Sequence, residues 1–391
     1  MADLLSLPLP HLAEQFLLRP DVAFLNHGSF GACPRPVFDA YQSWQRELEL
    51  EPVDFIGRRR GDLLAQARGV LGPYINASPD DFVFVHNATT GTNIVARSLD
   101  LQPGDEVLGT DMEYGAVNKT WRFLCEKRGA VYINQHISLP VDDPEEMVEE
   151  LWAGVTPRTK VISISHITSG TALRFPVEMV CQRARQEGIL TLLDGAHAPG
   201  QIDLDMQAIG ADFYSGNCHK WLCSPKGAAF LYVRKEQQQR IQPLVVSHGW
   251  GNEKINRSPF LDYLSEIGTE DPAAYLSVPA AVRFQQENDW PAVRSACHRL
   301  GVEALQRIEE LTGLPSVVPY DERWWSQMVI APVPPCDLGA LHRGLWEQFR
   351  VEIPGTSNGG RQFVRLSIQA YTTPEHIDRL LEGLAALLPR K

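Results

Sequence analysis

Short apolar runs rich in β-branched and aromatic residues recur along the first two thirds of the chain. Segments with helical periodicity, such as 115–129 and 176–188, lie between most of these runs. This alternation predicts an α/β fold in which helices cover a mainly parallel, seven-stranded sheet. The runs that we expect to form the strands are 82–86, 106–110, 131–134, 160–167, 189–194, 212–216 and 228–233.

The pattern changes in the turn-rich stretch 247–272. A long helical tract follows, from Pro272 to about Gly313, and after it come two strand candidates at 326–333 and 363–369. These elements predict a smaller α+β domain at the C-terminus. We therefore expect an N-terminal arm at 1–20, a large cofactor-binding domain at 21–270 and a small C-terminal domain at 271–391.

Composition narrows the class of protein. The chain has 391 residues, of which 44% are hydrophobic and 21% charged, as in an ordinary globular enzyme. The net charge of -12 is spread without a basic tract, which argues against nucleic acid or an anionic membrane as a partner. No run is apolar enough to span a bilayer, and the first residues lack a signal-peptide pattern. Seven cysteines without paired metal spacing fit a reducing compartment, so we expect a cytoplasmic location and no metal.

Asp194 and Lys220 carry the most specific chemistry, because each follows an apolar run and they are 26 positions apart. Pyridoxal 5'-phosphate (PLP) needs a lysine amine that condenses with its aldehyde and an acid that keeps its pyridine nitrogen protonated. Either residue alone would more commonly be a turn former or a solvated strand end. His197, three residues after the acid, could lie beside the ring oxygen or over the ring edge, and His219 could reach the phosphate.

A candidate phosphate site lies at 86–92, where small and hydroxyl residues follow a strand and precede a helix. Backbone N–H groups and the helix dipole favour an anion at such a helix start. A simple capping turn is the alternative for this segment alone. The chain contains neither GxxxxGK[ST] nor GxGxxG, so no motif supports nucleotide binding.

The tract from His219 and Lys220 to Gly227 resembles the lysine signature of the PLP-dependent fold type I enzymes of the class V aminotransferase superfamily. Together with 24–37, it is most similar to the isopenicillin N epimerase-like branch. Asn217 departs from the pattern, because many members have a small hydroxyl residue there; its amide would donate to the phosphate. The resemblance runs over nearly the whole chain and implies the fold type I architecture.

The resemblance also implies roles for single residues. Thr89 and Thr90 would bind the cofactor phosphate, and the ring of Tyr114 would stack on the pyridine face. Thr269 lies in a segment similar to one that crosses a dimer interface in this superfamily. There it would contact the phosphate of the partner chain, which implies a homodimer with shared active sites.

Arg365 lies inside the strand candidate 363–369, where a charged side chain needs an anionic partner or exposure. An internal salt bridge is one possibility. The resemblance implies instead that Arg365 binds the carboxylate of an amino-acid substrate in a two-pronged fashion. It also makes Asn26 and His27 candidate substrate contacts at the entrance of the active site. The cluster 58–60, of three arginines, is either solvated or meets a second acidic group of the substrate.

The segment 352–367 contains no cysteine, whereas cysteine desulfurases carry a nucleophilic cysteine on the corresponding loop. Cys336 lies well upstream, so persulfide chemistry is disfavoured. We therefore expect a PLP enzyme that acts at the α or β carbon of a small L-amino-acid-like substrate, in the manner of isopenicillin N epimerase. A carbon-sulfur lyase, of the cysteine desulfurase or sulfoxide lyase type, and an aminotransferase remain alternatives. Epimerisation would need a second acid, for which Tyr114 and His27 are weak candidates.

Two other enzyme classes explain less. A cofactor-free Schiff-base aldolase would use Lys220 but would leave Asp194 and the phosphate site without a role. A metal hydrolase could use the histidines, but their spacing does not match an HExxH-type motif.

Overall fold

The computed structural model describes residues 9–251 and 258–389 of the chain. Its largest element is a seven-stranded sheet with the strand order β2-β8-β7-β6-β5-β3-β4. β8 runs antiparallel to both of its neighbours, and the other neighbouring strands are parallel. This confirms the predicted α/β fold class and its mainly parallel sheet. The strands are β2 (Phe82–Val85), β3 (Glu106–Thr110), β4 (Val131–Gln135), β5 (Thr159–Ser165), β6 (Leu190–Gly195), β7 (Phe213–Asn217) and β8 (Ala229–Val233).

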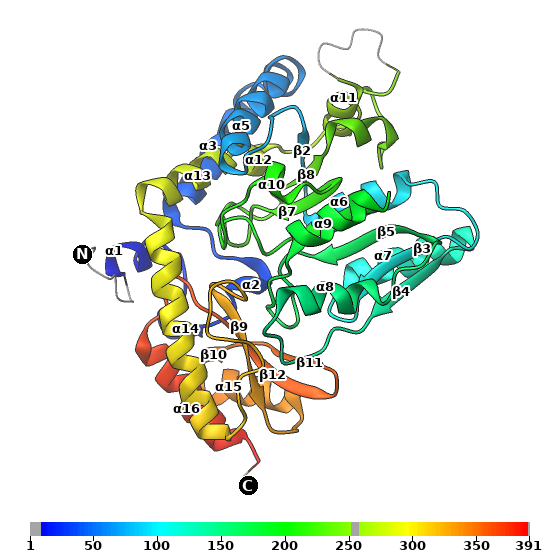
Figure 1. Ribbon diagram of the computed structural model, residues 1–391. Coiled ribbons are helices and arrows are strands. Elements are labelled where there is room, and N and C mark those ends of the chain that lie inside the picture. The colour runs from blue at the N-terminus through cyan, green and yellow to red at the C-terminus, as the bar shows by residue number, and fades with distance from the viewer. Residues whose placement is uncertain (1–8, 252–257, 390–391) are drawn as a thin grey trace.

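Helices cover both faces of this sheet (Figure 1). Along β2, Phe82 and Phe84 belong to one apolar cluster, while Val83 and Val85 belong to the other. Because successive side chains of a strand point to opposite faces, a strand covered on both sides tends to be apolar at successive positions. This explains why the continuous apolar runs predicted the strands. The helices that follow these strands are α6 (Ala88–Ser98), α7 (Gly115–Arg128), α8 (Pro144–Trp152), α9 (Val177–Gln186) and α10 (Met206–Ile209).

The smaller C-terminal domain contains an antiparallel sheet of order β11-β12-β9, at the bottom of Figure 1. The single helical tract expected before it is divided into α12 (Ala273–Leu276), α13 (Val278–Glu287) and α14 (Trp290–Thr312). Asp289, between the last two, has the left-handed φ of 44°, which ends one helix before the next begins. The remaining elements are β9 (Met328–Val333), α15 (Leu338–Phe349), β10 (Val351–Glu352), β11 (Gly355–Asn358), β12 (Arg361–Ser367) and α16 (Pro374–Leu387).

The segment before β2 joins the two parts of the molecule. β1 (Ala23–Phe24) pairs in parallel with β10 of the C-terminal domain. The boundaries that we expect at 20/21 and 270/271 stay a prediction. Among the described residues, no helix is both long and apolar enough to cross a membrane. The other helices are α1 (Pro10–Ala13), α2 (His27–Phe30), α3 (Arg35–Leu50), α4 (Pro52–Asp54), the π-helix η1 (Phe55–Arg59), α5 (Arg60–Tyr74), the 3-10 helix η2 (Lys235–Arg240) and α11 (Pro259–Ser265).

Candidate active site

A cavity of about 210 Å³ lies where three parallel strands end. Ser165 closes β5, Asp194 lies near the end of β6, and Asn217 closes β7. The carboxyl ends of neighbouring parallel strands are the usual place for a ligand in such a sheet. The residues of the sequence prediction that line the cavity are Thr89, Tyr114, Asp194, His197, Asn217, His219 and Lys220.

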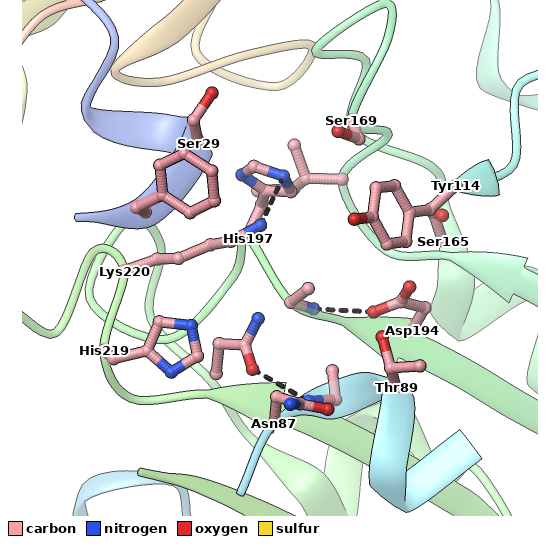
Figure 2. A pocket seen from close by; sticks show the side chains of 15 residues that line it. Ser29, Asn87, Thr89, Tyr114, Ser165, Ser169, Asp194, His197, His219 and Lys220 are labelled. Carbon is pink, nitrogen blue, oxygen red and sulfur yellow. Dashed lines mark hydrogen bonds between the residues drawn. The ribbon is translucent and has the colours of Figure 1, made fainter. Parts of the chain in front are cut away.

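Lys220 follows β7 and extends into the cavity toward His197 (Figure 2). Its Nζ lies 3.1 Å from Nε2 of His197. Burial lowers the pKa of Lys220 to about 8; the charge of Asp194 opposes this shift, and that of Arg365 adds to it. A lysine with a lowered pKa has a larger fraction of the neutral amine, which is the nucleophilic form.

Asp194 is buried, and its Oδ1 accepts a hydrogen bond of 2.9 Å from the backbone N–H of Ala196. Burial raises the pKa of this carboxyl, while the Ala196 N–H and the charge of Lys220 lower it. No salt bridge involving Asp194 occurs in the described part of the chain. A protonated pyridine nitrogen beside this carboxylate would supply the missing positive partner, so Asp194 fits the acid that PLP requires.

The start of α6, with Asn87 and Thr89, forms the end of the cavity that lies away from Ser29 (Figure 2). Asn87 caps this helix by accepting a hydrogen bond of 2.9 Å from the N–H of Thr90. Oδ1 of Asn217 accepts a hydrogen bond of 2.8 Å from the N–H of Ala88. With its oxygen used in this way, Asn217 retains its amide N–H groups as donors. Thr89, in the first turn, lines the cavity, whereas the hydroxyl of Thr90 donates to Asn87 at 3.1 Å. A helix start with hydroxyl and amide donors suits a phosphate.

His219, beside the lysine, lies at the same end of the cavity. Its Nδ1 is 3.1 Å from the carbonyl oxygen of Ala228 and must donate to it, because a carbonyl only accepts. Burial lowers the pKa of His219 to about 4. A phosphate within reach would favour the protonated ring, in which both nitrogens donate.

Arg365, on β12 of the C-terminal domain, is buried beside the cavity. Its Nη1 donates a hydrogen bond of 2.6 Å to the carbonyl oxygen of Ser169. Its Nη2 donates one of 3.0 Å to Oγ of Ser29 and one of 3.3 Å to Oδ1 of Asn26. Nε is buried without a partner, and burial lowers the pKa of Arg365 to about 10. No salt bridge to Arg365 occurs among the described residues, so the internal ion pair considered above is absent there. Since Ser29 and Ser169 line the cavity, an anion in it could reach the guanidinium.

Asn26 and His27 support other side chains. Asn26 donates 2.8 Å from Nδ2 to Glu352 and accepts from Arg365 through Oδ1. His27 is fully buried, with Nε2 at 3.0 Å from the carbonyl oxygen of Lys220 and Nδ1 at 2.9 Å from the hydroxyl of Tyr371. Asn26 therefore braces the arginine, and His27 holds the backbone of the lysine. Their direct contact with a substrate stays a prediction.

Tyr114 and Lys220 lie on opposite sides of the cavity (Figure 2). The tyrosine is 47% exposed, so its ring has a free surface on which a planar ligand could stack. Thr269 is exposed and does not line this cavity, and its contact with a second chain stays a prediction. Each arginine of the cluster 58–60 is paired with a carboxylate; for Arg60 the partner is Glu266. The cluster is therefore not merely solvated, and its contact with a second acidic group of the substrate stays a prediction.

Sequence reasoning missed Glu113, which lies behind the cavity wall. This buried carboxyl accepts a hydrogen bond of 2.6 Å from Oγ1 of Thr110 and one of 2.7 Å from Oγ of Ser165. Ser165 lines the cavity. Burial raises the pKa of Glu113 to about 7, the two hydroxyl donors lower it, and the charge of Asp194 raises it further. The only signal in the sequence was a charged residue between a strand and Tyr114. Ser169 gave no signal, whereas Ser29 belongs to the segment 26–31, a small-residue turn that we expected to line the substrate pocket.

The fold and the cavity together define a PLP-dependent enzyme of fold type I. Residues 33–380 match the family described as aminotransferase class-V, and the chain belongs to this family. It is 35% identical to isopenicillin N epimerase of Amycolatopsis lactamdurans, over 96% of this chain and 97% of that one. It is 30% identical to a probable chloroplastic L-cysteine desulfhydrase of Arabidopsis thaliana, over 94% of this chain and 83% of the relative.

Solved structures have the same fold. The cysteine desulfurase CsdA from Escherichia coli superposes with a TM-score of 0.82 at 20% identity, covering 97% of this chain and 99% of that chain. The cystine C-S lyase C-DES superposes with a TM-score of 0.81 at 22% identity, covering 95% and 99% of the two chains. At these identities the likeness concerns the fold, and the reaction must be argued from the site.

Proposed function

We propose that this enzyme acts at the α carbon of an L-amino-acid-like substrate and exchanges its α proton, as an epimerase does. The observation that carries the proposal is Arg365, a buried cation without an acidic partner among the described residues, next to the cavity that Lys220 and Asp194 line. A substrate carboxylate would neutralise this charge and receive two parallel hydrogen bonds. The amino group of the same substrate would then lie toward Lys220.

The residues divide the work as follows. PLP, when bound, withdraws electrons from the α carbon of an attached amino acid and so weakens its C–H bond. Nζ of Lys220, with its lowered pKa, takes the α proton as a general base. The carboxylate of Asp194 keeps a proton on the pyridine nitrogen, and Arg365 holds the carboxylate so that the α C–H bond faces the lysine.

Epimerisation needs a proton donor on the face opposite Lys220. Tyr114 lies across the cavity from the lysine and is partly exposed to it (Figure 2). Its hydroxyl is the candidate that we favour over His27, since both ring nitrogens of His27 are already engaged. The relatives named isopenicillin N epimerase support this reaction type.

A carbon-sulfur lyase is the second candidate. The relatives named L-cysteine desulfhydrase favour it, and it would need only Lys220 and a leaving group on the β carbon. The segment 352–367 forms β10, β11, β12 and their turns and carries no cysteine. A persulfide at that position is therefore excluded for this chain, and sulfur would leave the substrate directly.

One experiment separates these reactions. The PLP-loaded enzyme is incubated in deuterium oxide with a panel of L-amino acids, and recovered amino acid, keto acid and ammonia are measured. Deuterium at the α carbon with inverted configuration and no keto acid supports the epimerase. Keto acid with ammonia supports the lyase, and keto acid without ammonia supports transamination. If no amino acid of the panel gave deuterium at the α carbon, keto acid or ammonia, the proposed substrate class would be rejected.

Lys220 is tested by substitution. Lys220→Ala should abolish turnover and the absorbance band at about 420 nm that borohydride removes. Lys226→Ala is the matched control, because Lys226 is the next lysine and its Nζ donates 2.9 Å to the carbonyl oxygen of Gly31. A borohydride-fixed cofactor mapped to Lys226 by mass spectrometry would show that Lys220 is the wrong lysine.

We also propose a homodimer with shared active sites, in a reducing, cytoplasmic location. Thr269 is exposed, as a residue that serves a second chain must be, and all seven cysteines are unpaired. Thr269→Ala should weaken PLP binding. Mixing this variant with Lys220→Ala should restore tight binding in one site per mixed dimer. An active, PLP-saturated monomer in light scattering would contradict the shared site.

A further inference from the structure

Trp221 makes a hydrogen bond that determines which nitrogen of His197 carries a proton. Nε1 of Trp221 donates 3.3 Å to Nδ1 of His197, and Nε2 of the same ring lies 3.1 Å from Nζ of Lys220. An indole N–H can only donate, so Nδ1 must accept. A neutral imidazole that accepts at Nδ1 carries its proton on Nε2.

We propose that Trp221 is a positioning residue that holds His197 as the neutral Nε2–H tautomer, so that the ring presents a donor to Lys220 and to the ring oxygen of the cofactor. The inference rests on the proposed role of Lys220 and deepens it. It explains why an apolar, fully buried ring directly follows the lysine. A phenylalanine would fill much of the same space but could not specify the tautomer.

Both partners of this hydrogen bond are held in place. Trp221 is fully buried, and its carbonyl oxygen accepts 2.8 Å from Nε2 of Gln285. Gly200 has a φ of 88°, and a Cβ atom there would come within 2.3 Å of the carbonyl oxygen of Trp221. The carbonyl oxygen of His197 accepts 2.7 Å from Nε2 of Gln201. A hydrogen bond between two fixed groups loses little conformational entropy when it forms, so it can select a tautomer.

Burial and the surrounding charges disfavour the doubly protonated, cationic form of the His197 ring. The titratable groups that act on its ring are Lys220, Arg365, His219 and His27. Burial is the largest cause that holds the pKa of His197 well below its usual value. A protonated Lys220 would lower this pKa further, and the positive charge of Arg365 also lowers it. Asp194 lowers the net positive charge around Lys220. The ring is therefore neutral, and the choice that remains is between two tautomers.

The tautomer sets the state of Lys220. If Nε2 carries the proton, it donates, and Nζ must accept through the lone pair of a neutral amine. The neutral amine is the form that would condense with the aldehyde of bound PLP, and its two protons would leave with the carbonyl oxygen as water. With the proton on Nδ1, the lysine would instead donate to Nε2 and could remain an unreactive ammonium.

The tautomer is measured by nuclear magnetic resonance on cofactor-free protein labelled with ¹⁵N-histidine, with His197→Gln used to assign the signals. We expect a protonated Nε2 and an unprotonated Nδ1 in the wild type. In Trp221→Phe the Nδ1–H tautomer should become populated. The 420 nm band should then form about five-fold more slowly at neutral pH, the effect of losing one hydrogen bond. The rate should recover as the pH is raised and Lys220 loses its proton.

Trp325→Phe is the matched control. Trp325 is also fully buried, and its indole donates 3.0 Å to the carbonyl oxygen of Pro319 in the C-terminal domain. It should change neither the His197 signals nor the rate. In the His197→Gln background, Trp221→Phe should add no further slowing, because both changes act through one ring.

A wild-type His197 protonated on Nδ1, or on both nitrogens, would overturn the inference even if Trp221→Phe failed to fold. Equal slowing by Trp221→Phe with and without His197 would also overturn it. Failure of the proposed role of Lys220 would be seen separately, as a cofactor fixed by borohydride to another lysine while the tautomer stays as expected.

Discussion

Glu113 carries a buried carboxyl group whose charge depends on pH near neutrality. Its pKa is raised to about 7 from the usual 4.5, mainly by burial. Between these two values the native state binds more protons than the unfolded state, so stability falls as the pH rises. The contribution of protonated Glu113 is fully present below about pH 4.5 and is lost as the pH passes through about 7.

Glu113→Gln should reveal this dependence, because the amide resembles the protonated acid. Relative to the wild type, the variant should gain roughly 2 to 3 kcal/mol of unfolding free energy between about pH 5 and about pH 8. Urea unfolding at several pH values measures the difference. Glu145→Gln, which removes a carboxylate from an exposed position in the first turn of α8, is the control. A difference for Glu113→Gln that is independent of pH would show that the carboxyl stays in one charge state.

Arg365 is the second residue whose chemistry depends on its detailed shape. Arg365→Lys keeps the charge but replaces a planar two-pronged donor with a single point charge. We expect KM for the amino acid to rise roughly 10- to 100-fold, with a smaller change in kcat. Steady-state kinetics measure this split. Arg307→Lys, which changes an arginine paired with Asp378 on the surface, should leave both constants unchanged. An unchanged KM in Arg365→Lys would remove the carboxylate from this position.

The helix α6 depends on close contact with β7. A Cβ atom on Gly91 would lie 2.1 Å from Oγ of Ser215, a buried hydroxyl that donates 3.1 Å to the carbonyl oxygen of Ala88. Gly91→Ala should therefore push the helix start away from the sheet, at a cost of roughly 1 to 3 kcal/mol in stability, and weaken PLP binding. Thermal unfolding and PLP titration measure the two effects. Gly69→Ala, in α5 with open space around it, should instead stabilise by about 0.5 to 1 kcal/mol.

Elements that are buried on both sides could be predicted from the sequence. Most strands of the large sheet are short segments rich in apolar and β-branched residues, and this pattern can be read without tertiary information. β1 and β10 contain two residues each, too few for any periodicity, and exist because they pair with each other. Asp194 and Lys220 were recognised from their places at the ends of apolar runs. Ser169 and Glu113 could not be recognised, because their roles depend on which distant residues the fold brings beside them.

The active site is assembled from three regions that are far apart in the sequence. Lys220 comes from the large domain, Arg365 from the C-terminal domain, and Ser29 from the segment before β2. An amino acid held between Lys220 and Arg365 should therefore make local unfolding rarer around the cavity in all three of these regions. Hydrogen exchange with PLP and an unreactive amino acid should show slower exchange at 26–31, 165–171 and 361–369. In Arg365→Ala the slowing at 361–369 should disappear, while exchange in β2 stays the same in every sample. Slowing confined to the large domain would place the substrate away from Arg365.

The two contacts of His27 can form only in a certain order while the chain is being translated. Its ring connects the carbonyl oxygen of Lys220 with the hydroxyl of Tyr371, residues that leave the ribosome long after it. All strands of the large sheet precede Tyr371 in the sequence, so His27 can gain both of its contacts only after residue 371, just before α16, has been translated. We therefore expect tight binding of the cofactor to follow synthesis. On this expectation, fragments that end before Tyr371 should bind PLP more weakly than the finished chain.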